Sequence, residues 1–199
     1  MNKKEKEKTI ERYRDRFKKY GISPKSLGWK DRKSQILRFK ILSEIANLDK
    51  MSILDVGCGF GDFYKFLLKN GYRVKYTGFD IVPEFIEIAK RKYPECEFIL
   101  KDILQEKFQK KFDYVFSSGI FNAKISKNYS FLERMLEKMW TLAKKGISFN
   151  MMSDYVDYFD ETLFYYSPEK VFNLCRKFTR KIILRHDYPL YEFTIYLYK

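Results

Sequence analysis

A chain of 199 residues, 45% of them hydrophobic and 19% aromatic, is long and apolar enough to bury its own core, which excludes a disordered protein. Three widely spaced cysteines disfavour a disulfide scaffold and a zinc site built on paired cysteines. Lysine and arginine exceed aspartate and glutamate by 40 to 26, a formal net charge of +14 that keeps an anionic partner open. The sequence shows neither a secretory signal nor an apolar run that could span a bilayer, so we expect a cytoplasmic protein with no membrane partner.

The basic charge is concentrated at the beginning of the chain. Residues 1–50 hold sixteen lysine and arginine residues but only seven aspartate and glutamate residues. The apolar spacing predicts two helices there, one over residues 9–20 and one that starts near Ser34. We therefore divide a single domain into a basic helical segment, residues 1–48, which would form a cap or lid over an anionic ligand, and a core, residues 49–199. A solvated cationic helix face is the alternative interpretation of the same charges.

From residue 51 onward, short apolar runs alternate with amphipathic segments. We expect strands at residues 52–56, 74–79, 97–100, 112–117, 147–151, 181–185 and 192–198. Helices are expected at 62–70, 83–92, 130–144 and 168–180, with Gly146 ending the third of them. Strands that alternate with helices form a parallel sheet, whereas the last two strands have no helix between them and must be antiparallel. The sequence thus predicts an α/β fold: a seven-stranded, mostly parallel sheet with helices on both faces and an antiparallel last strand.

Three glycines, Gly57, Gly59 and Gly61, alternate between the first expected strand and the helix after it. Glycine adopts positive φ without strain and lets the backbone approach a ligand closely. The N–H groups of such a turn and of the following helix form an electropositive cradle at the carboxyl end of the strand, where open α/β sheets bind ligands. The third glycine comes one residue too early for the dinucleotide pattern G-x-G-x-x-G, so the loop alone is not specific.

Two acidic residues follow the next two strands. Asp80 ends the second expected strand, where its carboxylate can accept hydrogen bonds from both hydroxyls of a ribose. Asp102 follows the third strand, where it can accept a hydrogen bond from an exocyclic amino group. Ile81 and Ile103 adjoin these carboxylates and can hold a flat purine ring between them.

With these motifs in this order, residues 34–199 resemble the class I S-adenosylmethionine-dependent methyltransferases. Their first motif matches residues 53–61, their ribose-binding acid falls on Asp80, their adenine-binding acid on Asp102, and their segment after the fourth strand on residues 112–122. The resemblance implies S-adenosylmethionine as the cofactor. It also implies a set of cofactor-binding residues: Asp55, which would bind the methionine amine, Gly57, Cys58, Gly59, Asp80, Ile81, Asp102, Ile103 and Ser117. Gln35 and Arg38, just upstream, are candidates for binding the methionine carboxylate.

The family resemblance also bears on the methyl acceptor. Residues 117–122 lack the Asn/Asp-Pro-Pro-Tyr/Phe segment of nucleic-acid amino-methyltransferases, which argues against methylation of a base amine. The chain has no pair of catalytic cysteines, which disfavours cytosine C5 chemistry, because Cys58 belongs to the cofactor loop. Asp154 and Asp157 follow the fifth expected strand, but the loop after the fourth lacks an acidic partner for them, so we predict no metal.

Candidates for direct contact with the acceptor follow the later strands. His186 is the single histidine, and imidazole is the natural proton acceptor near neutral pH, although a hydrogen-bonded structural histidine is the alternative. Asn122 is a second catalytic candidate, as a hydrogen-bond partner of the acceptor or of the cofactor amine. Three aromatic residues are expected to stack on the substrate, with a packed aromatic cap over the sheet as the alternative: Tyr155, Tyr158 and Tyr165.

We therefore expect an enzyme that transfers a methyl group to an oxygen or nitrogen of a small, anionic metabolite or sugar. The alternative enzyme is an RNA or protein methyltransferase that holds its partner through the basic segment, with nucleic acid the less favoured partner. A regulatory module that binds S-adenosylmethionine without turnover is the alternative from another class. The sequence does not predict the oligomeric state.

Overall fold

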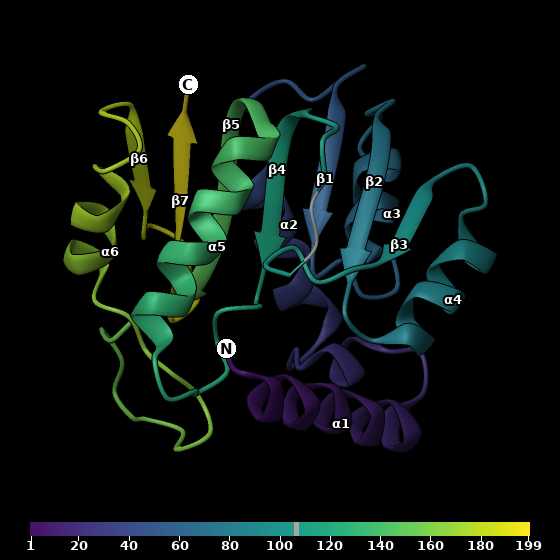
Figure 1. Ribbon diagram of the computed structural model, residues 1–199, viewed down its shortest axis with the longest axis horizontal. Coiled ribbons are helices and arrows are strands. Elements are labelled where there is room, and N and C mark those ends of the chain that lie inside the picture. Colours follow the sequence, from purple (N-terminus) through teal and green to yellow (C-terminus); the bar gives the residue numbers. More distant parts are fainter. Residues whose placement is uncertain (106–107) are drawn as a thin grey trace.

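A seven-stranded sheet occupies the centre of the structure, a computed structural model that describes residues 1–105 and 108–199 (Figure 1). The strands lie side by side in the order β3-β2-β1-β4-β5-β7-β6. β7 runs antiparallel to β5 and β6, whereas the other pairs are parallel, which confirms the predicted fold class. The strand bounds are Ser52–Val56 for β1, Lys75–Asp80 for β2, Glu97–Leu100 for β3, Phe112–Ser118 for β4, Ala143–Met152 for β5, Ile182–Arg185 for β6 and Glu192–Tyr198 for β7.

Helices cover both faces of the sheet. One apolar cluster joins one face to α2, α3 and α4 through side chains such as Phe63 and Ile86, and a second joins the other face to α5 and α6 through Met135 and Val171. None of the helices that the structure describes combines the length and the apolar character of a membrane span. The helix bounds are Lys3–Tyr20 for α1, Pro24–Leu27 for the 3-10 helix η1, Arg32–Ser43 for α2, Asp62–Lys69 for α3, Pro83–Lys92 for α4, Asn128–Leu142 for α5 and Pro168–Cys175 for α6.

The first helix is longer than the sequence analysis predicted. It begins at Lys3 because Asn2 caps it: the Asn2 side chain accepts a hydrogen bond from Glu5 N at 2.9 Å, and the Glu5 carboxylate accepts one from Asn2 N at 2.8 Å. The last helix is shorter, since α6 ends at Cys175 rather than near residue 180.

Gly146 does not end a helix, so this prediction was wrong. Helix α5 ends at Leu142, and β5 begins at the next residue. A Cβ atom at Gly146 would lie 2.5 Å from the backbone oxygen of Leu197 on β7. The glycine is therefore needed where two strands come unusually close together, rather than where a helix stops.

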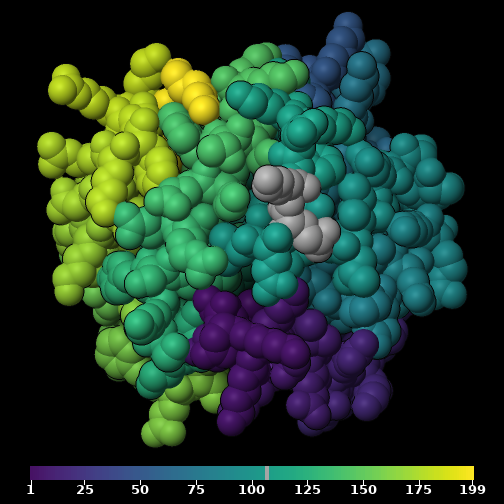
Figure 2. All heavy atoms as spheres, viewed as in Figure 1, coloured from purple at the N-terminus to yellow at the C-terminus, as the bar shows by residue number. Residues whose placement is uncertain are grey.

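Helix α1 lies beyond the carboxyl ends of β1, β2 and β4 (Figure 1), and Figure 2 shows the N-terminal residues spread over this edge of the molecule. Tyr13 and Phe17 are four residues apart and therefore share a face of α1. Their rings pack on Phe85 and Phe60, at centroid distances of 6.0 Å for Tyr13–Phe85 and 5.8 Å for Phe17–Phe60. These aromatic contacts hold the charged helix against the ends of the strands.

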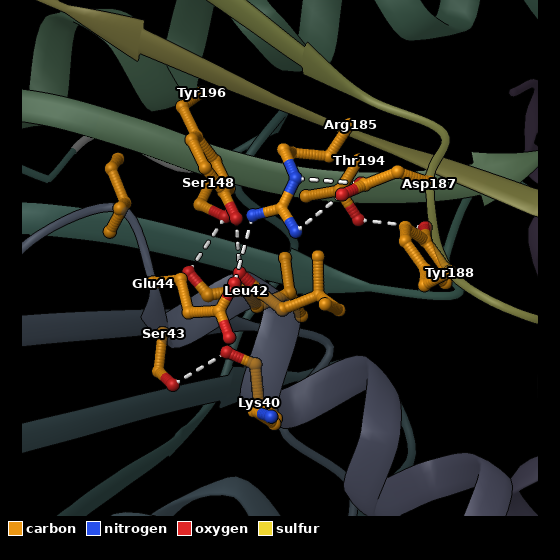
Figure 3. Close-up of polar contacts among 12 residues, drawn as sticks. Lys40, Leu42, Ser43, Glu44, Ser148, Arg185, Asp187, Tyr188, Thr194 and Tyr196 are labelled. Atoms are coloured by element: carbon orange, nitrogen blue, oxygen red, sulfur yellow. Dashed lines mark hydrogen bonds and ion pairs between the residues drawn. The ribbon is translucent and has the colours of Figure 1, made fainter.

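The carboxyl-terminal end of α2 is held on the sheet by hydroxyl groups (Figure 3). The last carbonyl groups of a helix have no partner within the helix. Here Ser148 Oγ of β5 donates to Leu42 O at 3.0 Å, and the Tyr196 hydroxyl of β7 donates to Ile41 O. Arg185 of β6 adds an ion pair to Glu44 at 2.8 Å. The position of α2, which borders the site described below, thus depends on β5, β6 and β7.

Replacing Tyr196 by phenylalanine is expected to lower the free energy of unfolding by about 1 kcal/mol, because the buried hydroxyl and the Ile41 carbonyl lose a hydrogen bond. Urea unfolding followed by circular dichroism measures the change. Tyr191→Phe is the control, since its hydroxyl bonds to Asp157 at an exposed position, and it should change the stability by less than about 0.5 kcal/mol. Equal losses in the two variants would contradict this account.

Candidate functional site

A cavity lies at the carboxyl ends of β1, β2, β3 and β4, beneath α1. Its volume is about 1190 Å³ when the open solvent at its mouth is counted. Residues from α1, from the segment between η1 and α2, and from α5 complete its wall. Eight of the nine cofactor-binding residues predicted from the sequence line it: Asp55, Gly57, Cys58, Gly59, Asp80, Ile81, Asp102 and Ile103.

The ninth, Ser117, is fully buried, and its hydroxyl donates to Val56 O at 2.9 Å. This bond ties the end of β4 to the end of β1. The next residue, Ser118, lines the cavity instead. Cofactor binding by Ser117 stays a prediction.

The glycine loop between β1 and α3 has the positive φ angles that the sequence analysis expected of its glycines. Gly57 has φ of +83°, and its N–H, like that of Cys58, donates to Phe79 O of β2, at 2.8 and 3.0 Å. A Cβ atom at Gly57 would lie 2.3 Å from Cγ2 of Ile120. Glycine here therefore allows the backbone turn and also the close approach of the loop that follows β4.

Asp80 is held by the backbone at the tip of β2. Its two carboxylate oxygens accept hydrogen bonds from Gly59 N and Val82 N, each at 2.9 Å. Burial raises the pKa of this carboxyl above its ordinary value, and the backbone N–H groups oppose the shift. Each oxygen retains a second lone pair, so the carboxylate can still accept hydrogen bonds from a ligand.

Asp55 lies in the floor of the cavity. The Tyr76 hydroxyl donates to its carboxylate at 2.5 Å. Burial raises the pKa of Asp55 to about 7, the Tyr76 bond opposes this, and the negative charge of Asp80 adds to it. A buried carboxyl with this pKa is suited to bind a cationic amine, because the amine would stabilise the ionised form.

Asp102 lies where α1 meets the cavity. Its carboxylate accepts from Leu104 N at 3.0 Å and pairs with Lys6 Nζ of α1 at 2.9 Å. Thr9 and Tyr13 of the same helix also line the cavity. The first turns of α1 thus reach the position at which the sequence predicts an adenine amino group.

The two candidates for the methionine carboxylate differ. Gln35 is fully buried and lines the cavity, with Nε2 3.4 Å from Asp62 Oδ2. Arg38 makes a bidentate pair with Glu192, at 2.8 Å from Nε and 2.7 Å from Nη2. Within the described residues, Gln35 is therefore placed for this role, and Arg38 is turned toward β7.

The two catalytic candidates are not part of the cavity lining that the structure describes. Asn122 Oδ1 accepts from Met152 N at 3.2 Å and so ties the loop after β4 to the end of β5. The His186 ring packs beside Tyr155 and Phe193, at centroid distances of 5.6 and 6.1 Å. Their catalytic roles stay predictions.

The three predicted substrate tyrosines also lie away from that lining. Tyr155 and Tyr158 are 58% and 68% exposed. The Tyr155 hydroxyl bonds to Glu169, and the Tyr165 hydroxyl accepts from Asp160 N at 2.9 Å. Stacking of these rings on a substrate stays a prediction. In the residues described, no group of three or more His, Cys, Asp or Glu side chains is arranged to hold a metal ion.

Among the lining residues that were not identified from the sequence, several come from its N-terminal part. Leu27 at the end of η1 and Trp29, between η1 and α2, line the cavity together with Tyr13. A Cβ atom at Gly119, which has φ of +78°, would lie 2.5 Å from the Trp29 ring. The aromatic pair Tyr13 and Phe17 on an otherwise charged helix was the available signal for α1, but nothing local indicates the contact of Trp29.

Comparison with known proteins agrees with this geometry. A model of the methyltransferase domain matches residues 53–146. Rv1506c of Mycobacterium tuberculosis, which is named as a methyltransferase, is 33% identical over 158 residues, which cover 76% of this chain and 95% of that protein. The solved complex of DhpI with S-adenosylhomocysteine has the same fold, with a TM-score of 0.72 and 16% identity, over 96% of this chain and 95% of that chain.

Two further relatives are named for their acceptors. Trans-aconitate 2-methyltransferase of an Enterobacter species is 30% identical over 118 residues, 59% of this chain and 45% of that protein. Malonyl-acyl-carrier-protein O-methyltransferase of Acetivibrio thermocellus is 36% identical over 85 residues, 40% of this chain and 30% of that protein. Both matches cover less than half of the relative.

Replacing Asp80 by alanine is expected to weaken the binding of S-adenosylhomocysteine at least tenfold, because a charged hydrogen-bond acceptor is lost from the predicted ribose site. Isothermal titration calorimetry measures the affinity. Asp49→Ala is the matched control, because this carboxylate pairs with Arg73 just before β1 and β2, at the amino ends of these strands. It should leave the affinity unchanged. The assigned role fails if Asp80→Ala binds as tightly as this control.

Affinity for S-adenosylmethionine is expected to rise with pH up to about pH 7 and then level off. Below its pKa of about 7, Asp55 is protonated, and a methionine ammonium would bind its ionised form, so the gain approaches tenfold per pH unit. Asp55→Asn should bind more weakly and with little pH dependence. Titrations of both proteins between pH 5.5 and 8.5 measure this, and parallel curves would argue against contact between Asp55 and the amine.

The same carboxyl is expected to make the ligand-free protein less stable as pH rises. The pKa of Asp55 is about 3.9 in the unfolded chain and about 7 in the folded chain. Between these two pH values the folded chain therefore binds more protons than the unfolded chain. Its contribution to stability therefore falls as pH rises through this window and is constant above it. Asp55→Asn should raise the melting temperature at pH 8 by several degrees relative to wild type, and a lower value would contradict the raised pKa.

Proposed function

Because the chain belongs to the class I S-adenosylmethionine-dependent methyltransferases, we propose that it transfers a methyl group to a carboxylate oxygen of a small molecule bound in this cavity. The observation that carries the proposal is the cover over the site, since α1 contributes Thr9 and Tyr13 to the cavity wall, and Met1, just before α1, adds to it. A site covered in this way suits a small acceptor better than a polymer.

The residues present fit the cofactor. Asp80 offers free lone pairs for ribose hydroxyls, Asp55 suits the ammonium group, and Asp102 with Ile103 borders the adenine position. When bound, S-adenosylmethionine supplies an electrophilic methyl group on a positively charged sulfur. We further propose that residues 1–48 act as the cap of the site, with Lys6 leaving Asp102 when the adenine amino group arrives.

A carboxylate acceptor would require no general base from the walls of the cavity. Its described lining contains aspartates on the cofactor side, while the α5 side is apolar, with Ile125, Phe131 and Met135. A carboxylate oxygen attacks without losing a proton, so the reaction needs orientation and exclusion of water rather than a general base. Trans-aconitate and malonyl groups, after which two relatives are named, both carry carboxylates.

The alternative acceptor, an RNA or protein, is supported by the basic N-terminal charge. In the structure, however, part of the positive charge of α1 is already paired. Lys6 binds Asp102 at 2.9 Å, and Arg14 binds Glu84 at 2.7 Å. A polymer held by many phosphates would also bind far more weakly as salt rises. The regulatory alternative requires binding without turnover.

Incubation of the protein with methyl-labelled S-adenosylmethionine and a panel of small acceptors tests the proposal. We expect base-labile methyl esters of di- and tricarboxylates such as malonate half-thioesters and trans-aconitate, and no product from Asp80→Ala. Label found in RNA or protein, or in amines but not carboxylates, would overturn it. Release of no S-adenosylhomocysteine with any acceptor, despite tight cofactor binding, would favour the regulatory module.

A further inference from the structure

Three buried polar atoms without a hydrogen-bond partner come from neighbouring positions beside the cavity: Arg38 Nη1, Ser118 Oγ and Asn150 Nδ2. Ser118 and Asn150 are paired residues on β4 and β5, so their side chains share one face of the sheet. Arg38 of α2 lies over the same face, because it binds Glu192, which is paired with Met152 two residues beyond Asn150. An unpaired buried donor costs free energy, so a ligand that accepts hydrogen bonds from these three atoms would be stabilised there.

The orientation of the Asn150 amide is fixed. Its Oδ1 accepts from Gly119 N at 3.0 Å, and since a backbone N–H can only donate, the oxygen must face Gly119. The NH2 group of Asn150 is therefore the free end. The residue is only 1% exposed, so bulk solvent does not satisfy that group.

The Arg38 guanidinium is fixed as well. Its Nε and Nη2 atoms bind Glu192, and its Cζ atom lies 4.5 Å from the centre of the Trp29 ring. Nη1 is the guanidinium nitrogen that remains without a hydrogen-bond partner. Glu192 neutralises the charge of Arg38, so the pair presents N–H donors without a net positive charge.

The cavity reaches one of these donors directly. Ser118 lines it together with Gly119 and Trp29, whereas Arg38 and Asn150 lie behind the described lining. Trp29 packs directly on the Gly119 backbone on one side and on Arg38 on the other. The three donors thus adjoin the wall of the cavity at the ends of β4 and β5, away from Asp80 and Asp102 on β2 and β3.

We propose that Asn150, Ser118 and Arg38 form a subsite that binds one oxygen of a carboxylate on the methyl acceptor, an inference that rests on the function proposed above. The subsite offers NH2, NH2 and OH groups, and its unpartnered atoms include none that can only accept a hydrogen bond. Such a set matches a ligand oxygen that only accepts hydrogen bonds. Because the Arg38–Glu192 pair is neutral, it suits a singly charged carboxylate better than a phosphate dianion.

The test is binding of trans-aconitate and of malonate to the protein saturated with S-adenosylhomocysteine. Asn150→Asp keeps the oxygen that accepts from Gly119 N but replaces the free NH2 donor by a negatively charged oxygen. We expect it to weaken binding of the carboxylates at least tenfold, while affinity for S-adenosylhomocysteine changes less than twofold. Asn47→Asp is the matched control, because the Asn47 Oδ1 also accepts from a backbone N–H, that of Asp49 at 3.0 Å, at an exposed position outside the described cavity lining. It should bind the carboxylates like wild type.

A second readout does not require a variant to fold. In wild type, the side-chain amide signals of Asn150 in ¹⁵N-resolved spectra should shift when trans-aconitate is added. Carboxylate binding that is equal in Asn150→Asp and wild type, or that leaves these signals unmoved, would overturn the subsite but not the proposed function. If wild type takes up S-adenosylhomocysteine but neither carboxylate, the carboxylate acceptor itself is refuted, and the subsite with it.

Discussion

The structure depends on placing carboxylates at the tips of adjacent parallel strands where water is largely excluded. Removing a charge from water is costly unless other groups replace the lost hydrogen bonds. Asp80 obtains them from Gly59 N and Val82 N, and Asp55 obtains one from Tyr76. The glycine turn is thus part of the electrostatics as well as of the shape, since it directs a backbone N–H toward the end of the next strand. The positive groups of a bound cofactor would complete the set.

The cofactor half of the site could be predicted from the sequence because its residues sit next to strand ends. The carboxyl ends of parallel strands meet at one edge, so finding β1, β2 and β3 in the sequence already brings Asp55, Asp80 and Asp102 together. The capping box of Asn2 and Glu5 is also a local signal, and it would have predicted that α1 begins at Lys3. Gly146 was misinterpreted because a glycine that ends a helix and one that lets strands approach have the same local sequence.

The proposed acceptor half of the site could not be predicted from the sequence, for a physical reason. Arg38 and Glu192 are 154 residues apart, and their contact exists only once α2 is seated on β5 and β7. The same holds for Trp29, which packs on Gly119 across the cavity wall. Such contacts follow from tertiary packing rather than from any repeating pattern. Substrate stacking by the tyrosines after β5 stays a prediction, since Tyr155 and Tyr158 are exposed and no local pattern shows what their rings contact.

The first turn of α1 links the two halves of the cavity. Glu5 caps its own helix at Asn2 and also accepts a hydrogen bond from Ser126 N, in the loop before α5, at 2.8 Å. These backbone donors hold the pKa of Glu5 at about 2, so its carboxylate is ionised at neutral pH. Lys6, the next residue, forms an ion pair with Asp102. A ligand that displaced Lys6 from Asp102 would remove one of the two contacts that hold this turn, the other being the Glu5–Ser126 hydrogen bond. Occupancy beside β3 would then be coupled to the order of the loop before α5.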